Sequence, residues 1–219
     1  MTVAAAVLAA GRGSRLGGDA SKPLLAWHGR PLVAWALDAV LASGLAPVVV
    51  VVGYRGADVR DAVAAALALP PGASRGSRTH VGENSEMFVG AGTVEVVENP
   101  QWEEGIASSL RTALATLTPR AAVDAVCVGL ADQPLVGADA YARVAATAGE
   151  LVVPTYDGQP GNPVKLARSL WREALELRGD VGARALARDR AVRIDCTGTG
   201  SAVDVDTLED LERLQQEDQ

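Results

Sequence analysis

Several features that would assign the protein to a particular class are missing from its 219 residues. The two cysteines, Cys127 and Cys196, lie in apolar stretches and do not form the spaced framework of a disulfide-stabilised domain. No apolar run approaches the roughly 20 residues that a membrane-spanning helix needs. The opening stretch TVAAAVLAAG has no basic leader and no cleavage site of a signal peptide, so we expect a cytoplasmic protein.

Positive charge is also in short supply. Lys and Arg number 20 against 27 Asp and Glu, which leaves a net charge of -7. General attraction to a nucleic acid or to an anionic membrane is therefore excluded as a mode of binding. Any anionic ligand must be held by a local cluster of cations.

What the sequence does contain is a regular alternation of short apolar runs and longer amphipathic stretches. We predict strands at 2–9, 46–53, 93–98, 123–130, 150–156 and 191–195. We predict helices at 31–43, 57–68, 106–117, 138–148, 167–177 and 207–216. Continuous apolar strands are typical of a sheet covered on both faces, so the pattern indicates a single α/β domain, 1–219, with a mainly parallel sheet.

One segment, residues 70–92, does not follow this alternation. It is rich in Gly and Ser and shows no clear period. A loop of that length inside a compact domain is unusual. We predict a flexible insertion there.

The first strand runs into a glycine-rich stretch, LAAGRGSRLGGDASKPLL, at residues 8–25. A dinucleotide fingerprint would need a third glycine where Leu16 stands, and an acidic residue after the second strand, which instead continues as GYRG. A Walker loop would need its lysine directly after the last glycine, whereas Lys22 comes four residues after Gly18 and precedes Pro23.

A third arrangement fits the spacing better. Backbone N–H groups at Gly11 and Gly13 could approach a triphosphate closely, while Arg12, Arg15 and Lys22 neutralise its charge. An ordinary surface loop would explain one arginine, but not three cations among four glycines directly after the first strand.

The pattern L-A-A-G-x-G-x-R-L-G followed by K-P-L-L resembles the N-terminal signature of the MobA-like nucleotidyltransferases, and within them the molybdenum cofactor cytidylyltransferases. The resemblance implies a three-layer α/β/α, Rossmann-like (GT-A-like) nucleotidyltransferase fold whose first loop binds a nucleoside triphosphate. It extends in order and spacing over essentially the whole chain, with 70–92 as the main departure. The nucleotide-binding residues it implies are Leu8, Ala9, Ala10, Gly11, Arg12, Gly13, Arg15, Lys22, Asn99, Gly105 and Ser109.

Acidic residues in two separate stretches suggest a metal site. Asp132 follows the buried strand 123–130 in the motif ADQP, where a carboxylate could hold Mg²⁺ together with substrate phosphates. A second group, VDVDTLED, offers Asp204 and Asp206, although Asp206 could equally cap the last helix. By resemblance Asp132 is a metal ligand and the later aspartates complete the site, Asp204 before Asp206. Arg15, Lys22 and Asp132 are the expected catalytic residues.

Three further motifs match the same family. The stretch N-P-x-W-x-x-G-x-x-S-S-L at 99–110 borders the base and ribose pocket in the cytidylyltransferase-like branch, although its residues would also suit a plain helix start. The stretches GQPGNPVKL and RGDVGARAL include Lys165 and Arg184, which suit an acceptor that carries a phosphate. The acceptor-binding residues implied by these stretches and by ADQP are Pro134, Gly161, Pro163, Asp180, Gly182 and Arg184.

The resemblance implies Mg²⁺-dependent transfer of a nucleoside monophosphate from CTP to molybdopterin, with release of pyrophosphate. An acceptor already ionised at pH 7 needs no general base, which suits a chain whose only histidines, His28 and His80, lie outside these motifs. A molybdoenzyme or its chaperone is the expected protein partner. Three alternatives stay open: transfer of guanylyl or onto a sugar 1-phosphate, a non-catalytic protein that binds or delivers a cofactor, and, more distantly, a Rossmann oxidoreductase.

Overall fold

The computed structural model describes residues 1–13, 21–68, 80–81, 86–89, 92–187 and 190–217. Its strands are β1 (Thr2–Ala9), β2 (Ala26–Trp27), β3 (Arg30–Pro31), β4 (Val48–Val52), β5 (His80–Val81), β6 (Glu86–Val89), β7 (Gly92–Glu98), β8 (Val123–Leu130), β9 (Leu151–Tyr156), β10 (Gln159–Pro160), β11 (Val164–Ala167) and β12 (Val192–Asp195). Its α-helices are α1 (Leu32–Ala42), α2 (Gly56–Ala68), α3 (Ile106–Leu117), α4 (Ala138–Ala146), α5 (Trp171–Ala174) and α6 (Leu208–Glu217).

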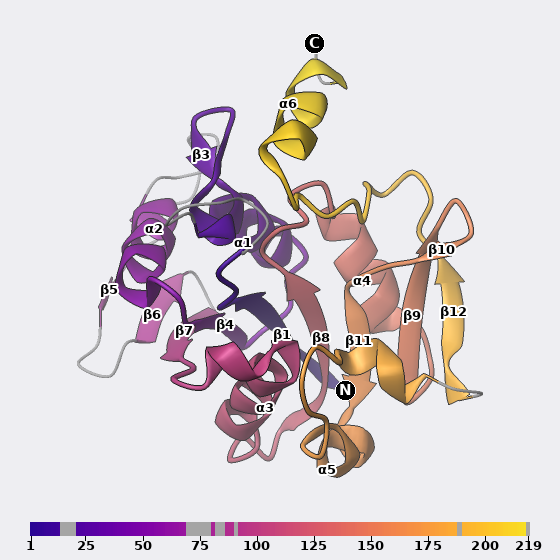
Figure 1. Cartoon of the computed structure of the whole chain (residues 1–219). Helices are drawn as coiled ribbons and strands as arrows, with labels where there is room; N and C mark the ends of the chain where they lie inside the picture. Colours follow the sequence, from indigo (N-terminus) through magenta and orange to yellow (C-terminus); the bar gives the residue numbers. More distant parts are fainter. Residues whose placement is uncertain (14–20, 69–79, 82–85, 90–91, 188–189, 218–219) are drawn as a thin grey trace.

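A single large sheet forms the middle layer (Figure 1). Over the described residues its order is β10-β9-β11-β8-β1-β4-β7-β6-β5, and β12 pairs with β9. The central strands β8, β1, β4 and β7 are parallel to one another, as predicted. Antiparallel pairing enters on both flanks, through β11 beside β8 and through β6 beside β7.

Helices cover both faces of this sheet because its strands are apolar on both sides. Ala5, Val7 and Ala9 of β1 pack in one core cluster with α1, α2 and α4. The alternate residues of the strand, with Ala4 and Ala6 among them, pack in a second cluster with α3 and α5. Figure 1 shows the two groups of helices on opposite sides of the sheet. The predicted three-layer α/β/α fold is confirmed.

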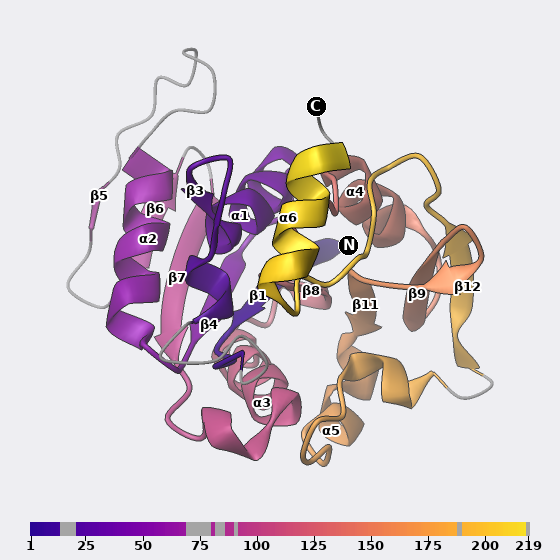
Figure 2. The ribbon, with the colours of Figure 1, turned by 45° about the horizontal axis from the view of Figure 1, so that its top comes forward.

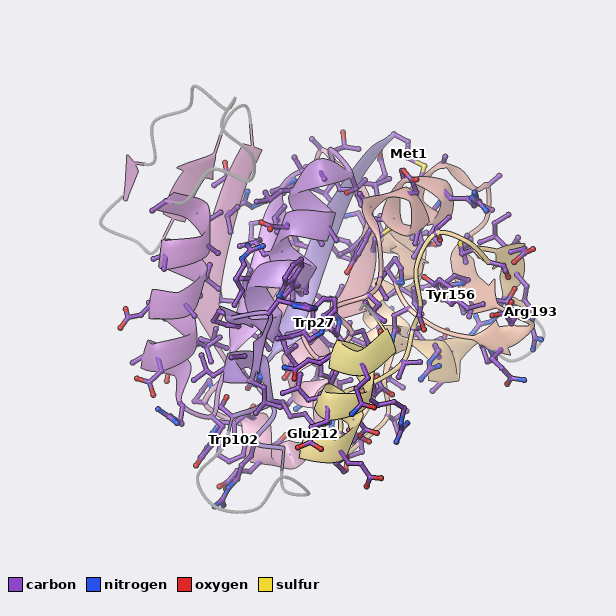
Figure 3. The ribbon with its side chains drawn as sticks, turned by 90° about the horizontal axis from the view of Figure 1, so that it is seen from above. Met1, Trp27, Trp102, Tyr156, Arg193 and Glu212 are labelled. Carbon is purple, nitrogen blue, oxygen red and sulfur yellow. The ribbon has the colours of Figure 1, made fainter. Side chains whose placement is uncertain are left out.

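The last helix packs outside these two layers. Leu211 and Leu214 of α6 join Trp27 and Leu32 in a third, smaller cluster, which fixes α6 against the β2–β3 hairpin and α1. Figure 2 shows α6 running beside this hairpin, and Figure 3 labels Trp27 next to it. The chain segment that leads into α6 carries the two C-terminal aspartates predicted to bind metal, so this cluster anchors them from one side.

Two predictions about elements need correction. The helix predicted at 167–177 is a 3₁₀ turn, Arg168–Leu170, followed by the single-turn α5. Strand β11 was not predicted, because it has only four residues and carries Lys165 among them. Within the predicted insertion 70–92, the described residues form β5 and β6, which extend the sheet beyond β7; the rest of that segment lies outside the described residues. In the described part of the chain, no helix combines the length and apolar character needed to cross a membrane.

Gly129 gives a direct test of packing between the sheet and α4. A Cβ atom on this residue of β8 would overlap the hydroxyl oxygen of Tyr141, a fully buried side chain of α4. We expect Gly129→Ala to lower the free energy of unfolding by about 1–3 kcal/mol, as overpacked cores do, measured by chemical denaturation. Adding Tyr141→Phe should recover part of the loss, because it removes the nearest overlapping atom. An unchanged stability in Gly129→Ala would contradict this packing.

Candidate active site

A cavity of about 430 Å³ lies at the carboxyl ends of β1 and β8. Ligands of open α/β sheets bind at this edge, because the loops that follow the strands gather there. Three parts of the chain form most of its wall: the glycine loop after β1, the ADQP turn after β8, and the start of α3. The lining residues are Leu8, Ala9, Ala10, Gly11, Arg12, Gly13, Lys22, Pro23, Trp102, Glu103, Gly105, Ile106, Ser109, Leu130, Ala131, Asp132 and Asp180.

Parallel pairing of β1 and β8 places the first two of these parts side by side. Leu8 is paired with Leu130, and the N–H of Ala131 donates to the carbonyl of Leu8 at 3.1 Å. The two strands therefore end at the same level. Gly11 comes three residues after Leu8, and Asp132 comes two residues after Leu130. Both line the same cavity, although more than a hundred positions separate them in the sequence.

The glycine loop presents bare backbone to the cavity. Among the described residues, apart from its two chain neighbours, none has a heavy atom within 4 Å of the position that a Cβ of Gly11 would occupy. Gly13 has a φ of 72°, a left-handed conformation that favours glycine. Next to them, the Arg12 guanidinium lies 5.2 Å from the ring centre of Tyr54, whose ring packs against Trp102. Arg15, predicted to contact the phosphates, lies outside the described residues.

Lys22 reaches into the cavity from the far side of the loop. Its ammonium forms an ion pair with Asp132 at 3.2 Å and a second one with Asp206. Burial by itself lowers the pKa of Lys22, but the two carboxylates raise it above its usual value, so this side chain stays protonated at neutral pH. The structure thus brings together three of the predicted catalytic and metal-binding residues.

Asp204 lies in the same cluster. Partial shielding from water raises the pKa of its carboxyl, and the charges of Asp132 and Asp206 raise it further. The side-chain amide of Gln133 donates to Asp204 Oδ1 at 2.8 Å. Three carboxylates thus share one small region, with Lys22 as a partly compensating charge.

This region suits a divalent cation in the chemistry of its donors. Carboxylate oxygens are what Mg²⁺ and Mn²⁺ prefer, and Mg²⁺ commonly takes only one or two of them together with substrate phosphates. Over the described residues, no three His, Cys, Asp or Glu side chains are arranged as a closed metal site. The Lys22 ammonium instead sits between Asp132 and Asp206, so a cation bound there would need this lysine to move toward the cavity.

The opposite wall of the cavity is the beginning of α3. Ser109 and Gly105, both predicted to bind the nucleotide, line this wall. Gly105 has a φ of 94°, and a Cβ there would meet Asp180 Oδ1 at 2.5 Å. Asp180 is therefore packed against this wall and lines the same cavity as the glycine loop, although it was predicted on the acceptor side. Asn99 is buried behind the wall, where its amide donates to Ser108 Oγ and Ser109 Oγ at 2.7 and 3.1 Å.

The remaining residues predicted to bind the acceptor do not line this cavity; they are Pro134, Gly161, Pro163, Gly182 and Arg184. Gly161 packs against Tyr156 and Ala202, and Arg184 Nη1 donates to the carbonyl of Pro160 at 3.0 Å. The stretches around 161 and 184 therefore contact each other beside the acidic cluster.

Lys165 was predicted to suit a phosphorylated acceptor, but it faces α4 instead. The side chain is 1% exposed, and its ammonium donates to the carbonyls of Ala145 and Thr147 at the end of α4. The interaction caps the helix and satisfies carbonyls that have no partner within it. The prediction was wrong because β11 was missed, and with it the inward direction of this side chain.

Several lining residues were missed, although most stand in motifs already quoted. Trp102, Glu103 and Ile106 belong to the stretch 99–110, and Ala131 to ADQP. A helix-start pattern could have indicated Ile106, but nothing in the sequence shows that the 3₁₀ turn Trp102–Glu104 folds over the cavity.

Comparison with known proteins agrees with this geometry. Residues 5–194 match the MobA-like NTP transferase domain. The chain belongs to this family. Its glycine loop, the ADQP turn and the start of α3 all fall within the matched residues, and so do all the described residues that line the cavity.

Two curated proteins that are similar to the chain carry different names. Nicotine blue oxidoreductase of Paenarthrobacter nicotinovorans is 29% identical over 97% of this chain and 96% of its own. Bifunctional protein GlmU of Pelobacter propionicus is 46% identical over 59 residues, and the chain spans only 13% of that protein.

Solved structures extend the comparison over the whole chain. Rv0371c of Mycobacterium tuberculosis H37Rv superposes with a TM-score of 0.71 at 29% identity, covering 98% of this chain and 97% of its own. The same protein has been crystallised in complex with manganese, with a TM-score of 0.68 and coverage of 99% of both chains. The inositol-1-phosphate CTP transferase of T. maritima shares the fold at 16% identity, with a TM-score of 0.67 over 99% of this chain and 94% of its own.

Two glycines of the cavity region should respond differently to the same substitution. Gly11→Ala places a methyl group in open space, so we expect unchanged thermal stability but weaker binding of a nucleoside triphosphate, by about tenfold for one lost backbone contact. In Gly53→Ala the new Cβ would lie 2.6 Å from Trp102 Cβ, so we expect this variant to lower the melting temperature even without nucleotide. Melting curves with and without nucleotide measure both effects. Tight nucleotide binding by Gly11→Ala would contradict a backbone contact at that position.

Lys165→Met should leave nucleotide and acceptor chemistry unchanged, because the side chain faces α4. Burial lowers the pKa of Lys165 below 10.5, so its charged form is disfavoured in the folded state. That cost is present below the folded pKa and is relieved as the pH rises from there toward 10.5. The wild type should therefore gain stability relative to Lys165→Met over this range, measured by denaturation at several pH values. A wild-type stability that falls relative to the variant would contradict the assignment.

Proposed function

We propose that the protein transfers a nucleoside monophosphate from a nucleoside triphosphate to a phosphorylated acceptor, releasing pyrophosphate, with CTP as donor and molybdopterin as acceptor. The observation that carries the proposal is that the bare glycine backbone, Lys22 and Asp132 line one cavity. A triphosphate needs the first two. In-line attack on its α-phosphorus needs a divalent cation to offset negative charge, and the third would be a ligand of that cation.

The chain's own residues supply positioning and electrostatics. Backbone N–H groups of the loop 11–13 bind the triphosphate, and Arg12 leaves the face of Tyr54 to contact it. Lys22 turns from its carboxylate partners toward the phosphates, where its ammonium offsets the charge that builds up during transfer. The nucleoside lies along the wall formed by Gly105, Ser109 and Trp102. An acceptor phosphate approaches from the side of the 161 and 184 stretches.

A divalent ion belongs to this proposal. Asp132 would hold it together with Asp204, and Asp206 could join them once Lys22 has moved. When bound, it would draw charge from the α-phosphate and make the phosphorus more electrophilic. Support comes from the manganese complex of the related Rv0371c. Magnesium is the ion we propose for this chain.

The relative named nicotine blue oxidoreductase supplies a second candidate function, an oxidation–reduction reaction. Its coverage of nearly the whole chain favours this candidate, but the local sequence disfavours it. Strand β4 ends at Val52 and continues as Gly53-Tyr54-Arg55, without the acidic residue that holds the ribose in dinucleotide-binding folds. Transfer therefore stays the first function to test.

Nucleotide choice is tested by thermal shift with CTP, GTP, ATP, UTP and NADH, each with Mg²⁺. We expect CTP to raise the melting temperature most, because a ligand that binds only the folded state stabilises it. Stabilisation by GTP alone would overturn cytidylyl transfer. Stabilisation by NADH alone would favour the oxidoreductase.

Turnover is tested by pyrophosphate release from CTP with molybdopterin and Mg²⁺. We expect Asp132→Asn to reduce the rate by about 10²-fold or more, because it removes a negatively charged ligand of the cation that offsets charge on the reacting phosphate. Asp124→Asn is the matched control: Asp124 lies at the opposite end of the same strand, where it accepts a bond from the N–H of Thr2. Full activity in Asp132→Asn would contradict its catalytic part. Binding without pyrophosphate release in the wild type would identify a carrier of the finished cofactor.

A further inference from the structure

Gln133 joins three segments of the chain that meet beside the acidic cluster. It follows Asp132 in the ADQP turn and is only 4% exposed. Its side-chain nitrogen donates to the carbonyl of Ala202 at 2.9 Å and to Asp204 Oδ1 at 2.8 Å. Its side-chain oxygen accepts a hydrogen bond from Asn162 Nδ2 at 3.0 Å. Every hydrogen-bonding atom of this buried amide is thus engaged.

The orientation of the amide follows from its partners. A carbonyl and a carboxylate can only accept, so the side-chain nitrogen must face Ala202 and Asp204. The oxygen then faces the side-chain amide of Asn162. The main-chain carbonyl of Asn162 accepts a hydrogen bond from the hydroxyl of Tyr156 at 2.7 Å. Tyr156, labelled in Figure 3, belongs to β9 on the far flank of the sheet. The chain of bonds runs from that flank to the acidic cluster.

The main chain around Asp204 is already held without Gln133. The N–H of Val205 donates to the carbonyl of Asp132 at 2.9 Å, and the N–H of Ser201 donates to the carbonyl of Leu135 at 3.0 Å. These bonds fix the path of the segment on both sides of Asp204. They leave the carboxylate, which is partly exposed, free to turn. Gln133 removes that freedom by binding one of its two oxygens.

We propose that Gln133 is a positioning residue, which holds the Asp204 carboxylate so that its second oxygen is presented to a divalent cation shared with Asp132. This inference rests on the proposed function and adds a residue to it. A carboxylate fixed before the cation arrives loses less rotational entropy on binding, and it is aimed correctly. Gln133 itself contacts neither substrate nor cation.

The test is a double-mutant cycle read by Mn²⁺ binding, with free Mn²⁺ measured by electron paramagnetic resonance. Gln133→Met keeps the length of the side chain but removes its donor. We expect it to weaken Mn²⁺ binding by about tenfold or more, as loss of such supporting bonds does elsewhere. In the Asp204→Ala background, the same substitution should cause no further weakening, because the carboxylate that it positions is absent.

A purely structural part for Gln133 predicts a different result. The substitution would then weaken Mn²⁺ binding by the same factor in both backgrounds, which would overturn the proposal, as would wild-type affinity in Gln133→Met or in Asp204→Ala. Asn162→Ala is the control for stability, since it removes a bond of Gln133 but leaves the bond to Asp204. We expect this control to lower the melting temperature while losing less Mn²⁺ affinity than Gln133→Met; an equal loss would contradict positioning.

The same variants separate this inference from the proposed function. Pyrophosphate release by the wild type tests the function alone. If no nucleoside triphosphate supports release while Gln133 and Asp204 remain coupled in Mn²⁺ binding, the function fails and the positioning part of Gln133 stands. If release occurs and the cycle is additive, the function stands and the positioning part fails.

Discussion

Parallel pairing between β1 and β8 is the constraint on which the site depends. The paired residues Leu8 and Leu130 end their strands at one level. Both strands are buried on both faces, so a shift of either would disturb the packing of both core clusters. This pairing brings the glycine loop and the ADQP turn to one cavity. The loop can hold an anion with its backbone, and the turn supplies the carboxylate that a phosphate-bound cation needs. Neither part would form a site alone.

Balance of charge within the cluster is the second organising factor. Asp132, Asp204 and Asp206 lie close enough to raise the pKa of Asp204, and Lys22 compensates two of them through ion pairs. The Lys22 ammonium thus lies where a divalent cation could bind. A ligand that brings both phosphates and a divalent ion offers new partners to the lysine and to the carboxylates at once. In the proposed function the ligand of this cluster is accordingly a metal–triphosphate complex and not either component alone.

The central strands, the glycine loop and the place of Asp132 after a strand could be predicted from the sequence, because long apolar runs and the motifs that follow them are patterns of consecutive residues. Strand β11 was missed, since four residues with Lys165 in their midst give no periodic signal, and so that lysine was misplaced. Asp180, predicted on the acceptor side, lines the same cavity as the glycine loop. The close approach of Gly179 and Asp180 to Gly105 that brings it there is a tertiary contact that no spacing reports. The proposed positioning role of Gln133 depends on contacts between segments that are far apart in the sequence, so it could not be predicted either. The predictions for Arg15 and for most of 70–92 concern residues outside those that the structure describes.

In the proposed function, one cavity binds a triphosphate across its glycine loop with a divalent cation at its acidic cluster. A crystal structure with a non-hydrolysable CTP analogue and Mn²⁺ tests it most directly, because anomalous scattering locates the ion independently of the nucleotide. We expect a manganese peak beside Asp132 and Asp204, phosphates against the backbone of Gly11 and Gly13, and Lys22 turned away from Asp206. Manganese elsewhere, or a nucleotide bound outside this cavity, would contradict it.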